Sequence, residues 1–135
     1  MQLSGQFKVI QWQESTKAEF DNGSKLNTAD IEQSYTGDIV GSSKVSYQLH
    51  YDTQSSSTFN GFEQLECEVQ GVEIQGTQTK GAKVHLVLIH RGVFKNGIAS
   101  SQFEILEARG MDELVGKTGS FEAAMGQDAH YQIEV

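Results

Sequence analysis

The sequence predicts an all-β protein, a closed or nearly closed antiparallel barrel of about eight strands. Apolar and polar residues alternate in most segments, most regularly over residues 45–51, which is typical of a strand with one buried face. The chain has 14 glycines and no proline, so its turns depend on the Gly, Asn, Asp and Ser residues that antiparallel hairpins use. Such sheets avoid exposed edges by closing.

The N-terminal part predicts two strands separated by a loop. Alternation predicts the first strand at about residues 5–13. Residues 14–24 are polar and end in Asn-Gly, so they are expected to form a loop. A long second strand is expected over residues 29–39, and Gly37 within it indicates a bulge or a sharp bend.

The middle of the chain predicts a hairpin followed by a further strand. The hairpin is expected to turn at residues 41–43, with residues 45–51 as its second arm. Residues 52–57 are rich in serine and are expected to form a turn, after which residues 59–68 alternate again.

Glycine-containing turns divide the C-terminal half. Residues 84–94 are apolar on both faces, which predicts cover by the loop at 14–24 or by a second subunit, and hence a homo-oligomer, a dimer or trimer. The expected elements are, in order, a ribbon at 72–74, a strand at 84–94, a turn at 96–97, a strand at 98–107, one helical turn at 111–115, a strand from 119, a turn at 126–128 and a strand at 131–135.

Length and charge limit the function classes. The 135 residues fit a single domain, residues 1–135. The formal net charge of -8 argues against nucleic acid and anionic membrane as partners, and it also serves solubility. Cys67 is the single cysteine and forms no internal disulfide. The start of the chain lacks the basic and apolar regions of a signal peptide, and no apolar run reaches the roughly 20 residues that span a bilayer, so a cytoplasmic location is expected.

Short glycine-and-aromatic motifs occur in a fixed order along the whole chain. They are Gly5-Gln6-Phe7-Lys8-Val9, Trp12, Glu14, Lys25-Leu26, Tyr35-Thr36-Gly37-Asp38-Ile39-Val40-Gly41, Tyr51, Phe59-Asn60-Gly61-Phe62-Glu63, His90-Arg91-Gly92-Val93-Phe94, Gly97, Glu113-Leu114-Val115-Gly116, Gly119 and Phe121. Together they resemble an uncharacterised bacterial family, classed as a domain of unknown function, whose fold is similar to the allene oxide cyclase barrel. The resemblance implies an antiparallel barrel with an interior cavity, and it implies no activity.

The chain departs from that family pattern at one turn. Family members tend to have Ser-Gly-Thr-Gly before the Glu-Leu pair, where this chain has Arg109-Gly110-Met111-Asp112. If this turn shapes the barrel mouth, the mouth is expected to be bulkier and more charged.

The sharpest candidate site is the pair Glu63 and His90. Each shares the phase of apolar neighbours on its strand, so both are expected to point into the barrel. A buried carboxylate requires a partner, and an imidazole is a natural one near neutral pH. Such a pair can orient a ligand or act as a general base, or the two groups can simply satisfy each other.

Four aromatic residues are candidates for the lining of a ligand pocket: Trp12, Tyr35, Tyr47 and Tyr51. Ordinary core packing is the alternative for all of them. The sequence therefore favours a barrel that binds a small, largely apolar molecule, with a cofactor-free isomerase, cyclase or hydrolase type of enzyme as the second reading. A structural role without a ligand is the third.

Metal, phosphate and thiol chemistry have little support in the sequence. The histidines His50, His85, His90 and His130 have no metal-ligand spacing, so no metal and no cofactor are expected. Cys67 falls on the inner face and is expected to be an inert buried thiol.

Overall fold

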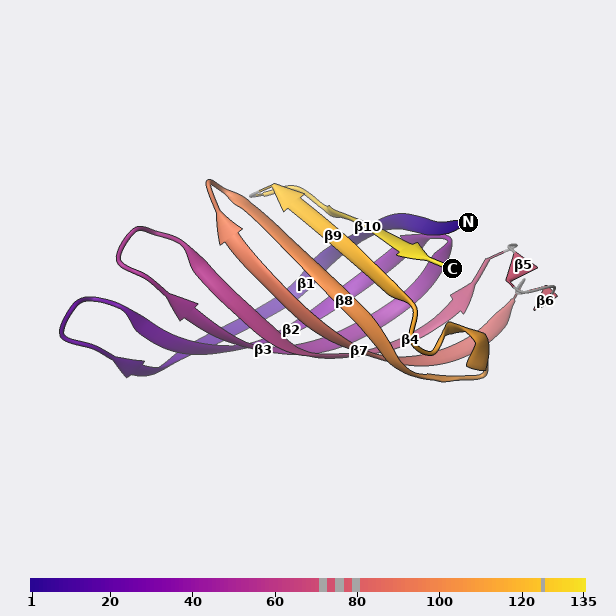
Figure 1. Cartoon of the computed structure of the whole chain (residues 1–135), viewed down its shortest axis with the longest axis horizontal. Helices are drawn as coiled ribbons and strands as arrows, with labels where there is room; N and C mark the ends of the chain where they lie inside the picture. The colour runs from indigo at the N-terminus through magenta and orange to yellow at the C-terminus, as the bar shows by residue number, and fades with distance from the viewer. Residues whose placement is uncertain (71–72, 75–76, 79–80, 125) are drawn as a thin grey trace.

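The computed structural model describes residues 1–70, 73–74, 77–78, 81–124 and 126–135. Eight long strands form a closed antiparallel barrel in the order β1-β10-β9-β8-β7-β4-β3-β2, and β5 and β6 form a separate two-stranded ribbon (Figure 1). The elements are β1 (Gln2–Glu19), β2 (Lys25–Gly37), β3 (Ile39–Tyr51), β4 (Ser57–Val69), β5 (Glu73–Ile74), β6 (Thr77–Gln78), β7 (Ala82–Lys95), β8 (Ile98–Arg109), the 3-10 turn η1 (Asp112–Leu114), β9 (Thr118–Ala124) and β10 (Ala129–Glu134).

This architecture confirms the predicted all-β fold. Consecutive strands of the barrel are neighbours, as in an up-and-down meander, and β10 returns to pair with β1. The turns predicted at 52–57, 96–97 and 111–115 are present, and Asn96 and Gly97 both have positive φ, as a tight hairpin requires. The ribbon predicted at 72–74 lies partly outside the described residues. The described residues include no helix long and apolar enough to cross a membrane.

The hairpin predicted at residues 41–43 is wrong in position. The chain turns at Gly37, whose φ is +100°, and at the next residue, Asp38. Gly41 lies inside β3, where a Cβ would be 2.1 Å from the carbonyl oxygen of Glu66 on β4. That glycine therefore serves the close approach of two strands rather than a turn.

The loop predicted at residues 14–24 is wrong for residues 14–19, whereas its Asn-Gly turn is present between β1 and β2, with a φ of +92° at Gly23. β1 continues to Glu19 and pairs with β2 along its whole length, with irregularities between Val9 and Gln11 and between Thr16 and Ala18. Its second half is polar because β10 pairs only with residues 2–7, which leaves one edge of β1 beyond Phe7 unpaired among the described strands. The barrel is thus closed at one end and open along this edge.

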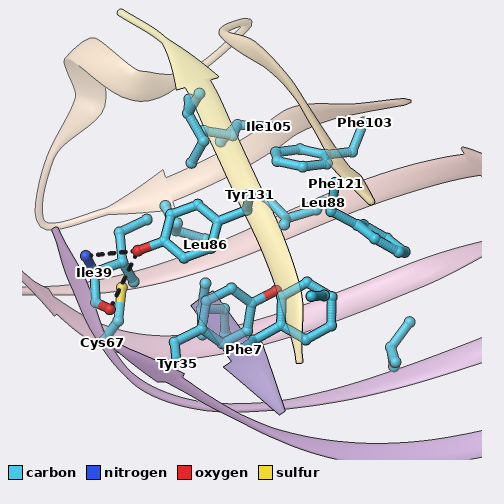
Figure 2. Close-up of a cluster of buried hydrophobic side chains, with 14 of the residues drawn as sticks. Phe7, Tyr35, Ile39, Cys67, Leu86, Leu88, Phe103, Ile105, Phe121 and Tyr131 are labelled. Carbon is cyan, nitrogen blue, oxygen red and sulfur yellow. Dashed lines mark hydrogen bonds between the residues drawn. The ribbon is translucent and has the colours of Figure 1, made fainter. Parts of the chain in front are cut away.

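Part of the buried core lies at the end of the barrel where the two chain termini meet, and the termini are seen side by side in Figure 1. Figure 2 shows Tyr131 reaching across this end to Ile39, whose backbone N–H donates to the tyrosine oxygen at 2.9 Å. The same hydroxyl lies 3.0 Å from the carbonyl oxygen of Thr36, to which it donates. Phe7 stacks on Tyr35 with ring centroids 5.0 Å apart. Tyr131 therefore fixes the β2–β3 turn to the last strand.

Candidate functional site

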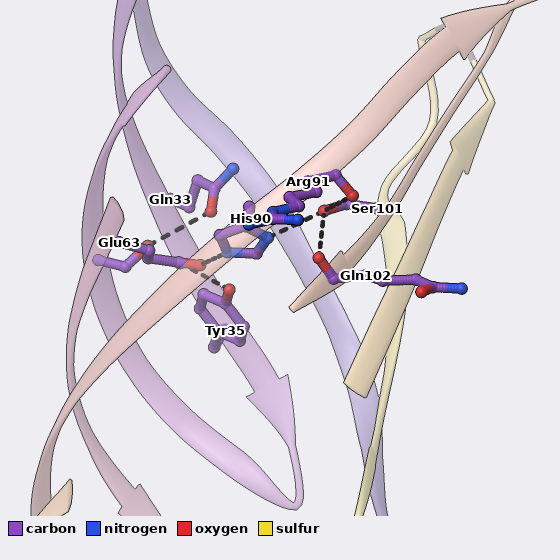
Figure 3. Close-up of polar contacts among 8 residues, drawn as sticks. Gln33, Tyr35, Glu63, His90, Arg91, Ser101 and Gln102 are labelled. Carbon is purple, nitrogen blue, oxygen red and sulfur yellow. Dashed lines mark hydrogen bonds and ion pairs between the residues drawn. The ribbon is translucent and has the colours of Figure 1, made fainter. Parts of the chain in front are cut away.

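Four buried polar side chains from four strands meet inside the barrel (Figure 3). Oε1 of Glu63 on β4 lies 2.6 Å from Nε2 of His90 on β7. Tyr35 on β2 donates its hydroxyl to Oε2 of Glu63 at 2.6 Å. Nδ1 of His90 lies 3.1 Å from Oγ of Ser101 on β8. Glu63 and His90 are each 1% exposed, so both point into the barrel, as the alternation predicts.

Ser101 completes the hydrogen bonding of the Glu63–His90 pair. Oγ of Ser101 lies 3.2 Å from the carbonyl oxygen of Arg91 and 3.3 Å from that of Gln102. Because a carbonyl only accepts, the serine donates there and accepts from the Nδ1–H of His90. Nε2 of His90 and Oε1 of Glu63 make the other hydrogen bond of the ring, and this pairing lowers the cost of burying both groups.

Burial keeps two neighbouring phenols protonated. Desolvation raises the pKa of Tyr35 well above its ordinary value, and the charge of Glu63 and its hydrogen bond raise it further. Desolvation, followed by the same carboxylate, raises the pKa of Tyr47. Both hydroxyls are therefore donors rather than bases near neutral pH.

Aromatic rings enclose His90 and limit what the network can do. The imidazole centroid lies 5.1 Å from the ring of Phe103, 5.7 Å from Phe121 and 5.8 Å from Tyr47. Ser101, His90 and Glu63 supply the residue types of a hydrolase triad, but the serine is buried and its hydroxyl donates to backbone carbonyls. That hydrogen bonding opposes a nucleophilic role.

A cavity of about 310 Å³ lies beside this network, at the open end of the barrel. It is lined by Phe7, Val9, Trp12, Ile31, Gln33, Tyr47, Leu49, Tyr51, Ser57, Phe59, Phe94, Ala99, Phe121, Ala123, Gln127 and Ala129. The structure thus brings Trp12, Tyr47 and Tyr51 to the cavity, while Tyr35, Glu63 and His90 lie outside its lining.

At the edge of the cavity, Glu14 on β1 accepts three hydrogen bonds. Nε1 of Trp12 donates to Oε1 at 2.9 Å, and Oε2 accepts from the Tyr51 hydroxyl at 2.7 Å and from Nδ2 of Asn27 at 2.6 Å. Burial raises the pKa of Glu14, but these hydrogen bonds and the charge of Lys25 outweigh it and lower the pKa below its ordinary value. Burial and Glu14 together raise the pKa of Tyr51. An ionised carboxylate therefore lies at the rim of an apolar cavity.

Sequence reasoning missed Glu14, Asn27 and Ser101 as members of these clusters. Glu14 was assigned to a loop because its neighbours are polar. Ser101 lies at an inward position of its strand, as the alternation of residues predicts. That position was the evidence in the sequence that it could contact His90.

The other titratable candidates lie apart from the cavity. His85 points outward and lies 3.7 Å from Glu66, and His50 and His130 are exposed. Cys67 is buried, and desolvation followed by the charge of Glu63 raises its pKa to about 12. The thiol is therefore held in its neutral form.

Comparison with known proteins supports the fold and identifies the family. A crystal structure of a protein with unknown function from the DUF3224 family of Shewanella oneidensis MR-1 matches with a TM-score of 0.65 and 15% sequence identity, covering 98% of this chain and 94% of that one. At this identity the likeness shows the fold alone. No curated protein matches. The similarity to the allene oxide cyclase barrel stays a prediction. The model of the family described as Protein of unknown function (DUF3224) matches residues 3–135, and the chain therefore belongs to the DUF3224 family.

Proposed function

We propose that the protein binds a small, mostly apolar molecule in the 310 Å³ cavity. The observation that carries this proposal is the lining, which is formed by aromatic and aliphatic side chains with few polar groups. A volume near 300 Å³ is at the small end of ligand sites, which are mostly apolar and largely pre-formed. The protein would act as a binding module without a cofactor.

The outer surface offers less to such a ligand. A larger depression of about 940 Å³ lies over the outer faces of β7–β10, but it is bordered by exposed polar side chains such as Arg91, Glu122 and Gln132. Little apolar area would be removed from water there, and burial of apolar area is the main source of affinity for an apolar molecule.

Proton-transfer chemistry at Glu63 and His90 is the second reading from the sequence. A substrate in the cavity would have to pass Tyr47 and Phe121, which line the cavity and also pack against the imidazole. This packing favours binding over catalysis.

A series of linear alcohols tests the binding proposal. Calorimetric titration with n-hexanol, n-heptanol and n-octanol should show affinity rising about fourfold per carbon, because each buried methylene contributes about 0.8 kcal/mol. Ala99→Phe places a ring in the cavity and should abolish binding. Ser100→Phe, on the outer face of the same strand, is the matched control and should bind normally. Absence of alcohol binding, or equal binding by Ala99→Phe, would overturn the proposal.

We also propose a cytoplasmic homo-oligomer, a dimer or trimer. Its support is the outer face of β7, where Val87 and Ile89 remain partly accessible in the single chain. Light scattering on the purified protein measures the mass, and a strictly monomeric mass would rule out the assembly.

A further inference from the structure

We propose that the rim of the cavity selects an apolar ligand that carries a protonated amine. The rim is formed by Trp12, Glu14, Asn27 and Tyr51. The inference rests on the proposed function, since the same cavity would hold the apolar body of the ligand.

The rim has an open hydrogen-bond acceptor on Glu14. A carboxylate oxygen accepts about two hydrogen bonds, and Oε2 of Glu14 already has two, from Tyr51 and Asn27. Oε1 has one, from Trp12, and so retains a further acceptor position.

Asn27 adds an unpaired acceptor next to Glu14, but this oxygen is shielded from solvent. Its side chain is only 6% exposed, and its Oδ1 has no hydrogen-bond partner in the described structure. The amide orientation is fixed, because a flip would place two oxygens in contact where Nδ2 now donates to Glu14. Asn27 pairs with Leu49, so the two side chains share the face that lines the cavity. A ligand donor would relieve the cost of this unpaired oxygen only after the Asn27 side chain shifts to expose it, so Oε1 of Glu14 is the acceptor that a ligand meets first.

Charge and aromatic rings at the rim favour a cation as that donor. The Lys25 ammonium lies 5.1 Å from the centroid of the Tyr51 ring, which shows that this ring already faces a cation. In the described structure Lys25 forms no ion pair with Glu14, so the carboxylate keeps its open acceptor position. The indole of Trp12 is 49% exposed at the same rim. The net charge of -8 also attracts cations from a distance.

A carboxylate head group is the competing possibility, because Lys25 offers a positive charge. The two possibilities predict opposite effects of Lys25→Met. This substitution should increase the binding affinity for an amine several-fold, because it removes a like charge. It would decrease the binding affinity for an anion.

Three probes with one apolar body test the inference. In calorimetric titrations at pH 7, n-octylamine should bind at least tenfold more tightly than n-octanol, and n-octanoate more weakly than n-octanol. Glu14→Gln should reduce the affinity for n-octylamine to that for n-octanol. The affinity for n-octanol itself should not change. Glu104→Gln removes the same charge from an exposed outer position on β8 and should preserve the amine preference.

A measurement on the unaltered chain complements the variants. Raising NaCl from 0.05 to 0.5 M should weaken the binding of n-octylamine, because salt screens the charge of the partly exposed Glu14. The binding of n-octanol should not change. If n-octanol binds but n-octylamine has no advantage, or if Glu104→Gln abolishes the advantage as Glu14→Gln does, the amine inference is overturned and the cavity proposal stands. If none of the three probes binds, both are overturned.

Discussion

Replacement of His90 by leucine should destabilise the barrel by about 3–5 kcal/mol at pH 7, the usual cost of breaking a buried ion pair. The substitution removes the group 2.6 Å from Oε1 of Glu63 and leaves Tyr35 as the remaining donor to that carboxylate. Leucine fills most of the volume of the ring, so the loss is mainly electrostatic. Ser101 also loses its contact with Nδ1. The cost is a large part of the roughly 5–15 kcal/mol net stability of a typical domain.

Urea unfolding of the wild type and three variants measures this cost. The control is His85→Leu, on the same strand but outward, where the side chain is 53% exposed and 3.7 Å from an exposed carboxylate. Such surface pairs contribute about 0–1 kcal/mol, so the control should unfold almost as the wild type does. The double variant Glu63→Met/His90→Leu should be more stable than His90→Leu alone, because it removes the unpaired carboxylate.

A loss under about 1 kcal/mol, or one no larger than that of His85→Leu, would refute the argument from a buried, hydrogen-bonded pair.

Four further predictions follow from single contacts. Tyr131→Phe should cost about 1–3 kcal/mol and speed hydrogen exchange at the Ile39 amide, which loses its acceptor; unchanged exchange would contradict the assigned bond. Gly41→Ala should cost about 1–3 kcal/mol or more in urea unfolding, because its Cβ would lie 2.1 Å from a backbone oxygen, and wild-type stability would disprove this contact. The Cys67 thiol, with a pKa of about 12, should resist iodoacetamide at pH 8 until urea unfolds the chain, and rapid native labelling would argue against its burial. The folded pKa of Glu14 lies below the ordinary 4.5, so its contribution to stability should be present above that pH and be lost as the pH falls through the folded value. In Glu14→Gln the free energy of unfolding should therefore fall less steeply at acidic pH. The same fall as in the wild type would contradict this prediction.

The inward direction of Glu63 and His90 was predictable from the alternation of residues along each strand. The residues that contact the pair were not predictable. Alternation assigns Glu63 and His90 to inward faces independently of any knowledge of pairing. Their contact depends on the β4–β7 register, in which Gly61 pairs with His90 and Glu63 with Leu88. Such cross-strand neighbours are close enough to interact, but a single sequence does not state the register of two strands 27 residues apart. Tyr35, from a third strand, was identified only as an aromatic candidate.

The predicted elements that differ from the structure lie where backbone pairing, and not side-chain polarity, determines the conformation. A glycine at position 41 suggests a turn, but here it allows close packing of β3 on β4. Polar residues beyond position 13 suggest a loop, but their backbones pair with β2 and Ser15 lies 3.3 Å from Thr28 across the two strands. Polar side chains indicate contact with solvent, but they do not distinguish a loop from a strand, because a strand with an unpaired edge is also in contact with solvent.

The misjudged half of β1 is also what creates the candidate site. β1 has 18 residues, whereas β9 has seven and β10 has six, so the strand that closes the barrel ends well before β1 does. The inward side chains Trp12 and Glu14 on this extension consequently face a part of the barrel interior where β10 no longer pairs with β1. The irregularity between Val9 and Gln11 adds one residue, which explains how Val9 and Trp12 both line the cavity at an odd spacing. The cavity thus arises from unequal strand lengths, and a chain whose β10 extended along β1 would close the opening at which we place ligand recognition.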